Sequence, residues 1–265
     1  MRNDNLKSYL NLHLIVFIWG FTAILGALIT ITADALVWYR MLFAGFFLAV
    51  FIVFKKKSFQ IPLRSLLKLV FVGLLIALHW IFFFKAIHVS NVSITLSVFS
   101  LGAFFASLLE PIFYGRKVLW YEVFFGLIII AGLALIMQVE INYLDGMLYA
   151  LTSIILGVLF TLMNGKLIER HDPSVISFYE FLAGFVFITF YFLLQQKFSF
   201  DFFVYFKFFF CLCDNTFCLY SLCIYRFCES HAEIVTIYRY VNDKFRAGLW
   251  DYFSLFYPWR KRKNE

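Results

Sequence analysis

Charged residues are scarce in this chain. Asp, Glu, Lys and Arg make up 15% of its 265 residues, whereas a soluble globular protein carries about 25%. Hydrophobic residues account for 63% and aromatic residues for 22% of the chain. A soluble fold of this length would need far more polar surface to cover its core. The composition therefore excludes an ordinary soluble domain, a disordered chain, a nucleic-acid-binding module and a small disulfide scaffold.

Catalytic motifs are also missing. The chain has no Gly-rich nucleotide-binding loop and no paired motif such as H-E-x-x-H or a carboxylate cluster. A membrane enzyme that uses intramembrane His and Glu is therefore disfavoured. We expect no enzyme activity, no cofactor and no resident metal. Any transport would draw its energy from a proton or solute gradient.

Long apolar runs are what the chain does contain. A hydrocarbon core about 30 Å thick is crossed by about 20 helical residues. Seven runs of about this length are predicted to be transmembrane helices, at residues 10–30, 35–54, 67–86, 92–114, 121–137, 146–163 and 175–194. The first is retained as a helix, because it has no small-residue cleavage site and six more runs follow. The expected fold is all-α, a polytopic transmembrane helix bundle.

Basic residues alternate along the loops between these runs. They precede the first span and fill the second, fourth and sixth loops, at Arg2, Lys7, Lys55, Lys56, Lys57, Arg64, Lys68, Arg116, Lys117, Lys166 and Arg170. The other loops are nearly bare of Lys and Arg. Because basic loops stay on the cytoplasmic side, the pattern predicts a multi-pass protein of the cell (inner) membrane with a cytoplasmic N-terminus.

An internal repeat links the second and seventh predicted spans. Residues 37–53 (VWYRMLFAGFFLAVFIV) and 177–193 (SFYEFLAGFVFITFYFL) share an aromatic residue, Tyr, a charged residue and then an apolar core. Arg40 and Glu180 occupy the same place in the two copies. The repeat unit is five helices long, so the second copy is inverted, as in many secondary carriers. Two such halves predict ten spans.

Several segments resemble the drug/metabolite transporter superfamily, specifically its ten-helix EamA-type carriers. They are Trp19-Gly20, the segment around Arg40, the stretch from His79 to Ser93, and the run Leu109 to Gly115 with its Glu-Pro pair. The resemblance implies a permease or exporter of small polar metabolites, such as amino acids or related compounds. It divides the chain into a first five-helix repeat at residues 8–137 and the start of a second at 146–200.

The family pattern stops near residue 201. All five cysteines lie between Cys211 and Cys228, with spacings that match no zinc site. Back-translation of Lys244 to Asp251 permits the order NLEPVYG in a frame shifted by one base, which echoes Leu109 to Gly115 (LEPIFYG). We therefore hypothesise that residues 201–265 are a frame-shifted tail and that the chain is inactive through truncation. The alternative is a membrane binding or scaffold protein with a Cys-rich tail.

Polar or aromatic residues within the spans or directly at their ends are the candidates for substrate binding or gating: Arg40, Glu180, His13, Trp19, His79 and Asn164. Charges in hydrocarbon are usually retained for function. For Arg40 the alternative is snorkelling to the interface, and for Glu180 and each His it is an interhelical hydrogen bond. Pro111 should kink or end its helix. The resemblance to EamA-type carriers implies that Glu110 and Pro111 form a hinge.

The expected partners follow from this assignment. They are the lipid bilayer and a small-molecule substrate. Protons are one candidate for the coupling ion, and a homodimer is one candidate assembly. No nucleic acid is expected, because the net charge of +7 is concentrated in the predicted cytoplasmic loops.

Overall fold

A computed structural model describes residues 2–28, 31–115, 117–139 and 141–195. Every regular element in these residues is helical, which confirms the all-α prediction. The helices are α1 (Arg2–Leu28), α2 (Ala33–Phe54), α3 (Leu63–Val89), α4 (Val92–Phe99), α5 (Gly102–Tyr114), α6 (Trp120–Val139), η1 (Ile141–Tyr143), α7 (Leu144–Leu167) and α8 (Pro173–Leu194). The expected tail at 201–265 lies outside the described residues.

Each of the seven predicted spans falls on a helix or a helix pair. Five segments are long and apolar enough to cross a membrane: Ala33–Phe54, Leu63–Val89, Val92–Tyr114, Leu144–Leu167 and Pro173–Leu194. The other two predicted spans contain shorter apolar stretches, Val16–Leu28 in α1 and Trp120–Leu135 in α6. Several helices extend past the predicted ends, because a helix continues beyond the apolar run until a cap or turn stops it.

The segment at 92–114 differs from the continuous span that its composition predicts. It is divided into α4 and α5 by a turn at Ser100 and Leu101. There the backbone N–H of Ser100 bonds the carbonyl of Ser97 at 3.2 Å, and that of Leu101 bonds Val98 at 3.1 Å. These three-residue bonds tighten the backbone, and the Ser100 hydroxyl adds a bond to the Ser97 carbonyl at 2.6 Å.

Pro111 does not end its helix. α5 contains Pro111 and continues to Tyr114. It stops at Gly115, whose φ of 66° lies in the left-handed region that glycine adopts without strain. Of the two predicted effects of Pro111, a kink or an end of the helix, the end does not occur at Pro111, and α5 ends one helical turn later.

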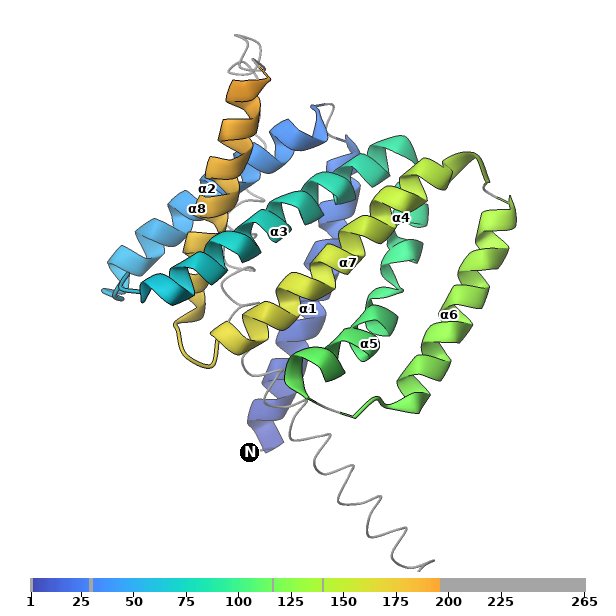
Figure 1. Ribbon diagram of the computed structural model, residues 1–265, viewed down its shortest axis with the longest axis horizontal. Helices are drawn as coiled ribbons and strands as arrows, with labels where there is room; N and C mark the ends of the chain where they lie inside the picture. Colours follow the sequence, from blue (N-terminus) through green and yellow to red (C-terminus); the bar gives the residue numbers. More distant parts are fainter. Residues whose placement is uncertain (1, 29–30, 116, 140, 196–265) are drawn as a thin grey trace, which may run out of the picture.

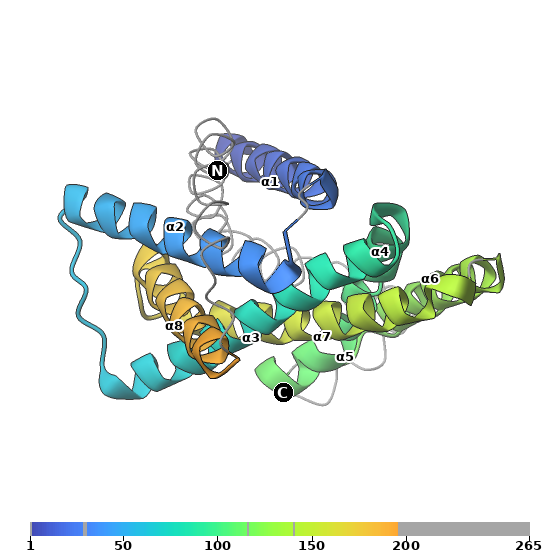
Figure 2. The same cartoon turned by 90° about the horizontal axis from the view of Figure 1, so that it is seen from above.

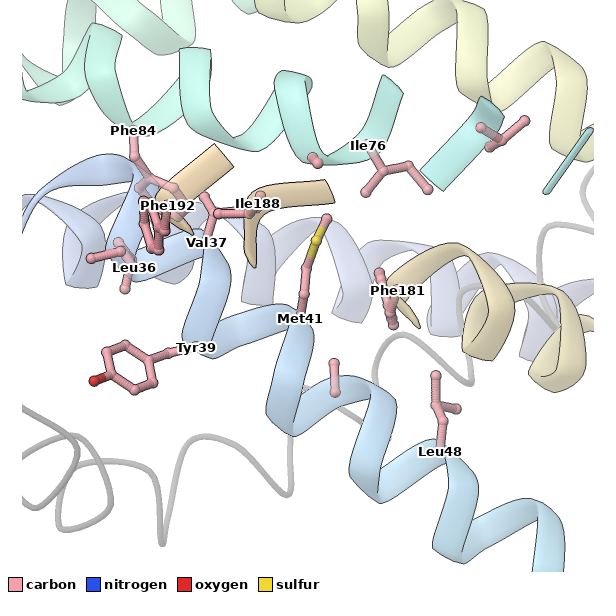
Figure 3. Close-up of a cluster of buried hydrophobic side chains, with 14 of the residues drawn as sticks. Leu36, Val37, Tyr39, Met41, Leu48, Ile76, Phe84, Phe181, Ile188 and Phe192 are labelled. Atoms are coloured by element: carbon pink, nitrogen blue, oxygen red, sulfur yellow. The ribbon is translucent and has the colours of Figure 1, made fainter. Parts of the chain in front are cut away.

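α3 is the central helix of the described bundle. It packs against both α7 and α8, and α8 also packs against α2. Figures 1 and 2 show α3 and α7 running side by side, with α8 crossing α2. Figure 3 shows side chains of the main apolar core at this crossing, to which α2 contributes Leu36 and Met41 and α8 contributes Phe181 and Ile188. The two helices of the proposed repeat, α2 and α8, are therefore in direct contact.

The outward faces of the helices are apolar. More than half of the surface of Phe46, Val50, Val186 and Phe190 is exposed on α2 and α8. Soluble proteins rarely leave such large apolar side chains uncovered over adjacent helices, whereas hydrocarbon solvates them well. The described bundle is that of a multi-pass membrane protein. The division into two inverted five-helix repeats stays a prediction.

Candidate functional site

Arg40 is a buried charge in the first half of α2. Arg40 is 8% exposed to solvent. Its guanidinium carbon lies 5.1 Å from the ring centre of Trp80 and 4.9 Å from that of Phe84. Both rings belong to α3, so the cation links α2 to α3. A desolvated cation over an aromatic face gains about 2 kcal/mol, which offsets part of the cost of removing the charge from water.

Glu180 lies on the neighbouring helix α8 and is even more buried, at 2% exposure. Its Oε2 accepts a hydrogen bond of 3.2 Å from Nδ2 of Asn164 on α7. The remaining oxygens of this pair, Glu180 Oε1 and Asn164 Oδ1, are buried without a hydrogen-bond partner among the described residues. The pair is the interhelical hydrogen bond that was one of the two sequence-based alternatives for Glu180.

Gly73 of α3 allows the backbone of α8 to approach closely at Glu180. A Cβ at Gly73 would collide with the backbone carbonyl of Glu180 and would lie 2.9 Å from the Cβ of Ala183. The absence of a side chain therefore lets the backbones of α3 and α8 approach closely, as small residues do between membrane helices. This crossing holds the Glu180 backbone against α3, while its carboxyl bonds Asn164 of α7.

His79 joins α3 to α7. Its Nδ1 lies 2.7 Å from the backbone carbonyl oxygen of Ser153 and 3.1 Å from the Ser153 hydroxyl. The same hydroxyl donates to the backbone carbonyl of His79 at 2.7 Å. A Cβ at Gly157 would sit 3.0 Å from the imidazole, so the small residue at that position makes room for the ring. His79 and Ser153 thus join α3 to α7 through hydrogen bonds.

Two aromatic side chains connect these polar groups. The ring of Trp80, which lies under Arg40, is 5.6 Å from the ring of Phe181, the residue after Glu180. Four of the six sequence candidates lie on the packed helices α2, α3, α7 and α8. Arg40 contacts rings of α3, Glu180 is bonded to Asn164 between α8 and α7, and His79 is bonded to Ser153 between α3 and α7.

The other candidates have different positions. His13 lies on α1 and is exposed. Trp19 is also in α1, but its side chain lies outside what the structure describes. Glu110 and Pro111 lie in α5, which packs against α6 and α7.

The end of α5 is attached to α7 by contacts that the sequence did not indicate. The Tyr114 hydroxyl donates to the backbone carbonyl of Leu162 at 2.9 Å. The Lys166 ammonium lies 5.6 Å from the ring centre of Tyr114 and 5.8 Å from that of Phe113. The Glu-Pro segment, predicted as a hinge, is therefore held close to the end of α7 that carries Asn164.

A second set of polar contacts joins the loop after α2 to the loop before α8. Lys57 Nζ lies 2.8 Å from Oδ2 of Asp172, and Asp172 Oδ1 also accepts the backbone N–H of Ser174 at 2.9 Å. Burial raises the pKa of the Asp172 carboxyl, but hydrogen bonds from Lys57 and Ser174 outweigh burial and leave that pKa below its ordinary value. Nearby, the Tyr179 hydroxyl donates to the carbonyl of Phe59 at 2.9 Å.

Sequence reasoning missed this ionic link. Asp172 before Pro173 is a recognisable helix start, and Asp172 does cap α8. Nothing local, however, identifies a partner 115 residues away.

The described residues hold no group of three or more His, Cys, Asp or Glu side chains that could bind a metal ion.

A family model described as the EamA-like transporter family matches residues 6–138, about half of the chain. Comparison with curated proteins gives no match, and comparison with solved structures gives none either.

Proposed function

The chain belongs to the EamA-like transporter family, and on this basis we propose that it is a secondary transporter of small polar metabolites such as amino acids. Its family consists of transporters rather than enzymes. We place it in the cell (inner) membrane with a cytoplasmic N-terminus, and export is the direction that the resemblance favours.

The buried guanidinium of Arg40 is the observation that supports a polar substrate. It lies within an apolar span against Trp80 and Phe84. A charge costs about 2.5–3.5 kcal/mol at the bilayer centre and less toward the end of a span, where Arg40 lies. A permanent cation in such a place suits recognition of a carboxylate on the substrate. Glu180 on α8 adds a group that can exchange a proton or bind a cationic group.

Contacts at one end of the bundle join the basic loops, as the alternating topology requires. Lys57 meets Asp172, and Tyr114 meets Leu162, so the connections after α2, α5 and α7 gather at the same end. These are the loops that the distribution of Lys and Arg assigns to the cytoplasm.

Transport in reconstituted vesicles tests the proposal. Uptake of radiolabelled amino acids would be compared between the present chain, a version whose reading frame is corrected near residue 201, and protein-free vesicles. We expect the corrected chain to transport and Arg40→Gln in that chain to weaken transport at least about tenfold, since a charged hydrogen bond contributes about 1.5–3 kcal/mol. Equal uptake in protein-free vesicles and in vesicles with the corrected chain would refute the proposal.

A further inference from the structure

Two buried oxygen atoms in the helix pair α7–α8 have no hydrogen-bond partner in the part of the chain that the structure describes. They are Oε1 of Glu180 and Oδ1 of Asn164. These atoms belong to the two groups that are already joined by the 3.2 Å bond from Asn164 Nδ2 to Glu180 Oε2. Buried polar atoms are almost always paired, so two orphans in one bonded pair call for a missing partner.

The chemistry of the two groups identifies that partner. An ionised carboxylate has only acceptors, whereas a protonated one has an O–H donor as well, and a primary amide has an N–H₂ donor and a carbonyl acceptor. With a proton on Oε1, that oxygen can donate to Asn164 Oδ1 while Oε2 still accepts from Nδ2. One proton therefore satisfies both orphaned oxygens and closes a ring of two hydrogen bonds.

We propose that burial in the bundle, with no counter-ion at hand, holds Glu180 as a neutral carboxylic acid that is hydrogen-bonded to Asn164, so that the pair is a proton-binding site between α7 and α8.

The charged groups around the site have other partners. Arg40 of α2 lies over Trp80 and Phe84, His79 of α3 is bonded to Ser153, and Lys166 of α7 lies over Phe113 and Tyr114. On α8 itself, the Tyr179 hydroxyl donates to Phe59. Among the described residues, none of these groups forms an ion pair or hydrogen bond with Glu180. An ionised Glu180 would thus be a buried charge without a counter-ion, which a proton avoids.

The position of the pair suggests how the proton is exchanged. Glu180 lies seven residues into α8, about 10 Å from the helix start, and Asn164 lies three residues before the end of α7. Separation of α7 from α8 would break the ring and admit water, so that Glu180 releases its proton to water and becomes a carboxylate. A role in coupling this release to transport rests on the proposed function, whereas the protonation state does not.

Infrared spectroscopy of the purified full chain in lipid vesicles tests the site without any transport. The C=O stretching band of a protonated carboxylic acid is well separated from the bands of a carboxylate. Near neutral pH we expect an acid band in the native chain that disappears in Glu180→Gln. Gln offers the same donor and acceptor to Asn164, so this variant should fold. Glu122→Gln, on α6, is the matched control and should keep the band.

A substitution of Asn164 and a change of the cation in the buffer complete the test. Asn164→Ala should keep the acid band but shift its frequency, because the ring is lost. The proposal would be overturned if the spectra of the native chain and of Glu180→Gln showed the same acid band. A second outcome would also overturn it: a carboxylate band that is absent in Glu180→Gln and that shifts when sodium chloride replaces choline chloride. Such a band would show that a cation, not a proton, occupies the pair. An acid band together with no transport by the frame-corrected chain would sink the proposed function and leave the proton site standing.

Discussion

The buried polar side chains of the described helices are stabilised one by one through aromatic or hydrogen-bonding neighbours. Arg40 lies over two rings, and His79 shares hydrogen bonds with Ser153. Without water in the hydrocarbon core, a polar group with no such neighbour would cost several kcal/mol. The position of each polar residue therefore depends on a few specific contacts, and single substitutions can measure them.

Ser153→Ala tests the hydrogen bonds that join α3 to α7. The variant loses the 2.7 Å bond to the His79 carbonyl and the 3.1 Å contact with the imidazole, but keeps the backbone carbonyl that faces Nδ1. We expect a loss of about 0.6–1.7 kcal/mol in the free energy of unfolding, the range for hydrogen bonds between membrane helices. Thermal unfolding in detergent micelles measures it.

Thr152→Ala is the matched control for this substitution. Its hydroxyl is exposed and bonds only the Leu148 carbonyl of its own helix at 2.9 Å. Equal losses in the two variants would contradict a role for Ser153 between helices.

At the scale of elements, close approach of backbones sets the arrangement of α3 and α8. Gly73 of α3 lies against the Glu180 backbone, and a Cβ at Gly184 of α8 would lie 3.0 Å from the Gly73 carbonyl oxygen. Small residues at both sides of a crossing allow the extended van der Waals contact that drives association in lipid. The position of Glu180 thus depends on a glycine in another helix.

Gly73→Ala tests this crossing. The added methyl would strike the Glu180 carbonyl, so α3 and α8 must move apart. We expect destabilisation by about 1–3 kcal/mol, as for overpacked cores, seen as a lower unfolding temperature.

Gly132→Ala in α6 provides the control for Gly73→Ala. A Cβ at Gly132 meets nothing within 4 Å. Because alanine favours helix over glycine, this variant should be unchanged or slightly stabilised. A similar loss at both glycines would contradict the crossing of α3 and α8 as the cause of the destabilisation in Gly73→Ala.

For the molecule as a whole, contacts between loops join segments far apart in the chain. The link from Lys57 to Asp172 connects the hairpin of α2 and α3 to that of α7 and α8. It lies at the polar end of the bundle, where water weakens ion pairs but leaves their pH dependence measurable.

Acidification should break this loop contact. The pKa of Asp172 is lowered in the folded chain, so the carboxylate stabilises the fold above the ordinary Asp pKa of about 3.9 and progressively less as the pH falls below it. Asp172→Asn keeps the helix cap but loses the charge. We expect the variant to be less stable than the native chain by about 0.2–1 kcal/mol at neutral pH, with the difference vanishing in acid. A pH-independent difference would show that the lost stability does not come from the charge of Asp172.

The reading frame is a second prediction for the whole molecule. If residues 201–265 are frame-shifted, a corrected frame should encode further spans that complete ten. Sequencing the gene across codons 195–215 measures this directly. Close relatives that encode the present tail in frame would disprove the hypothesis.

The sequence by itself determines which segments are membrane helices, because apolar runs of sufficient length have no other stable state in lipid. It also identifies Arg40, Glu180, His79 and Asn164 as unusual, since polar groups inside such runs are rare.

Only the tertiary structure decides which of these groups meet. The pairing of Glu180 with Asn164 depends on how α7 and α8 lie together, and the contact of Lys57 with Asp172 spans 115 residues. The turn at Ser100 interrupts a run that is continuous in hydropathy, because it arises from backbone hydrogen bonds. Helix formation is a local property that composition reports, whereas contacts between helices depend on crossing geometry that no single segment contains.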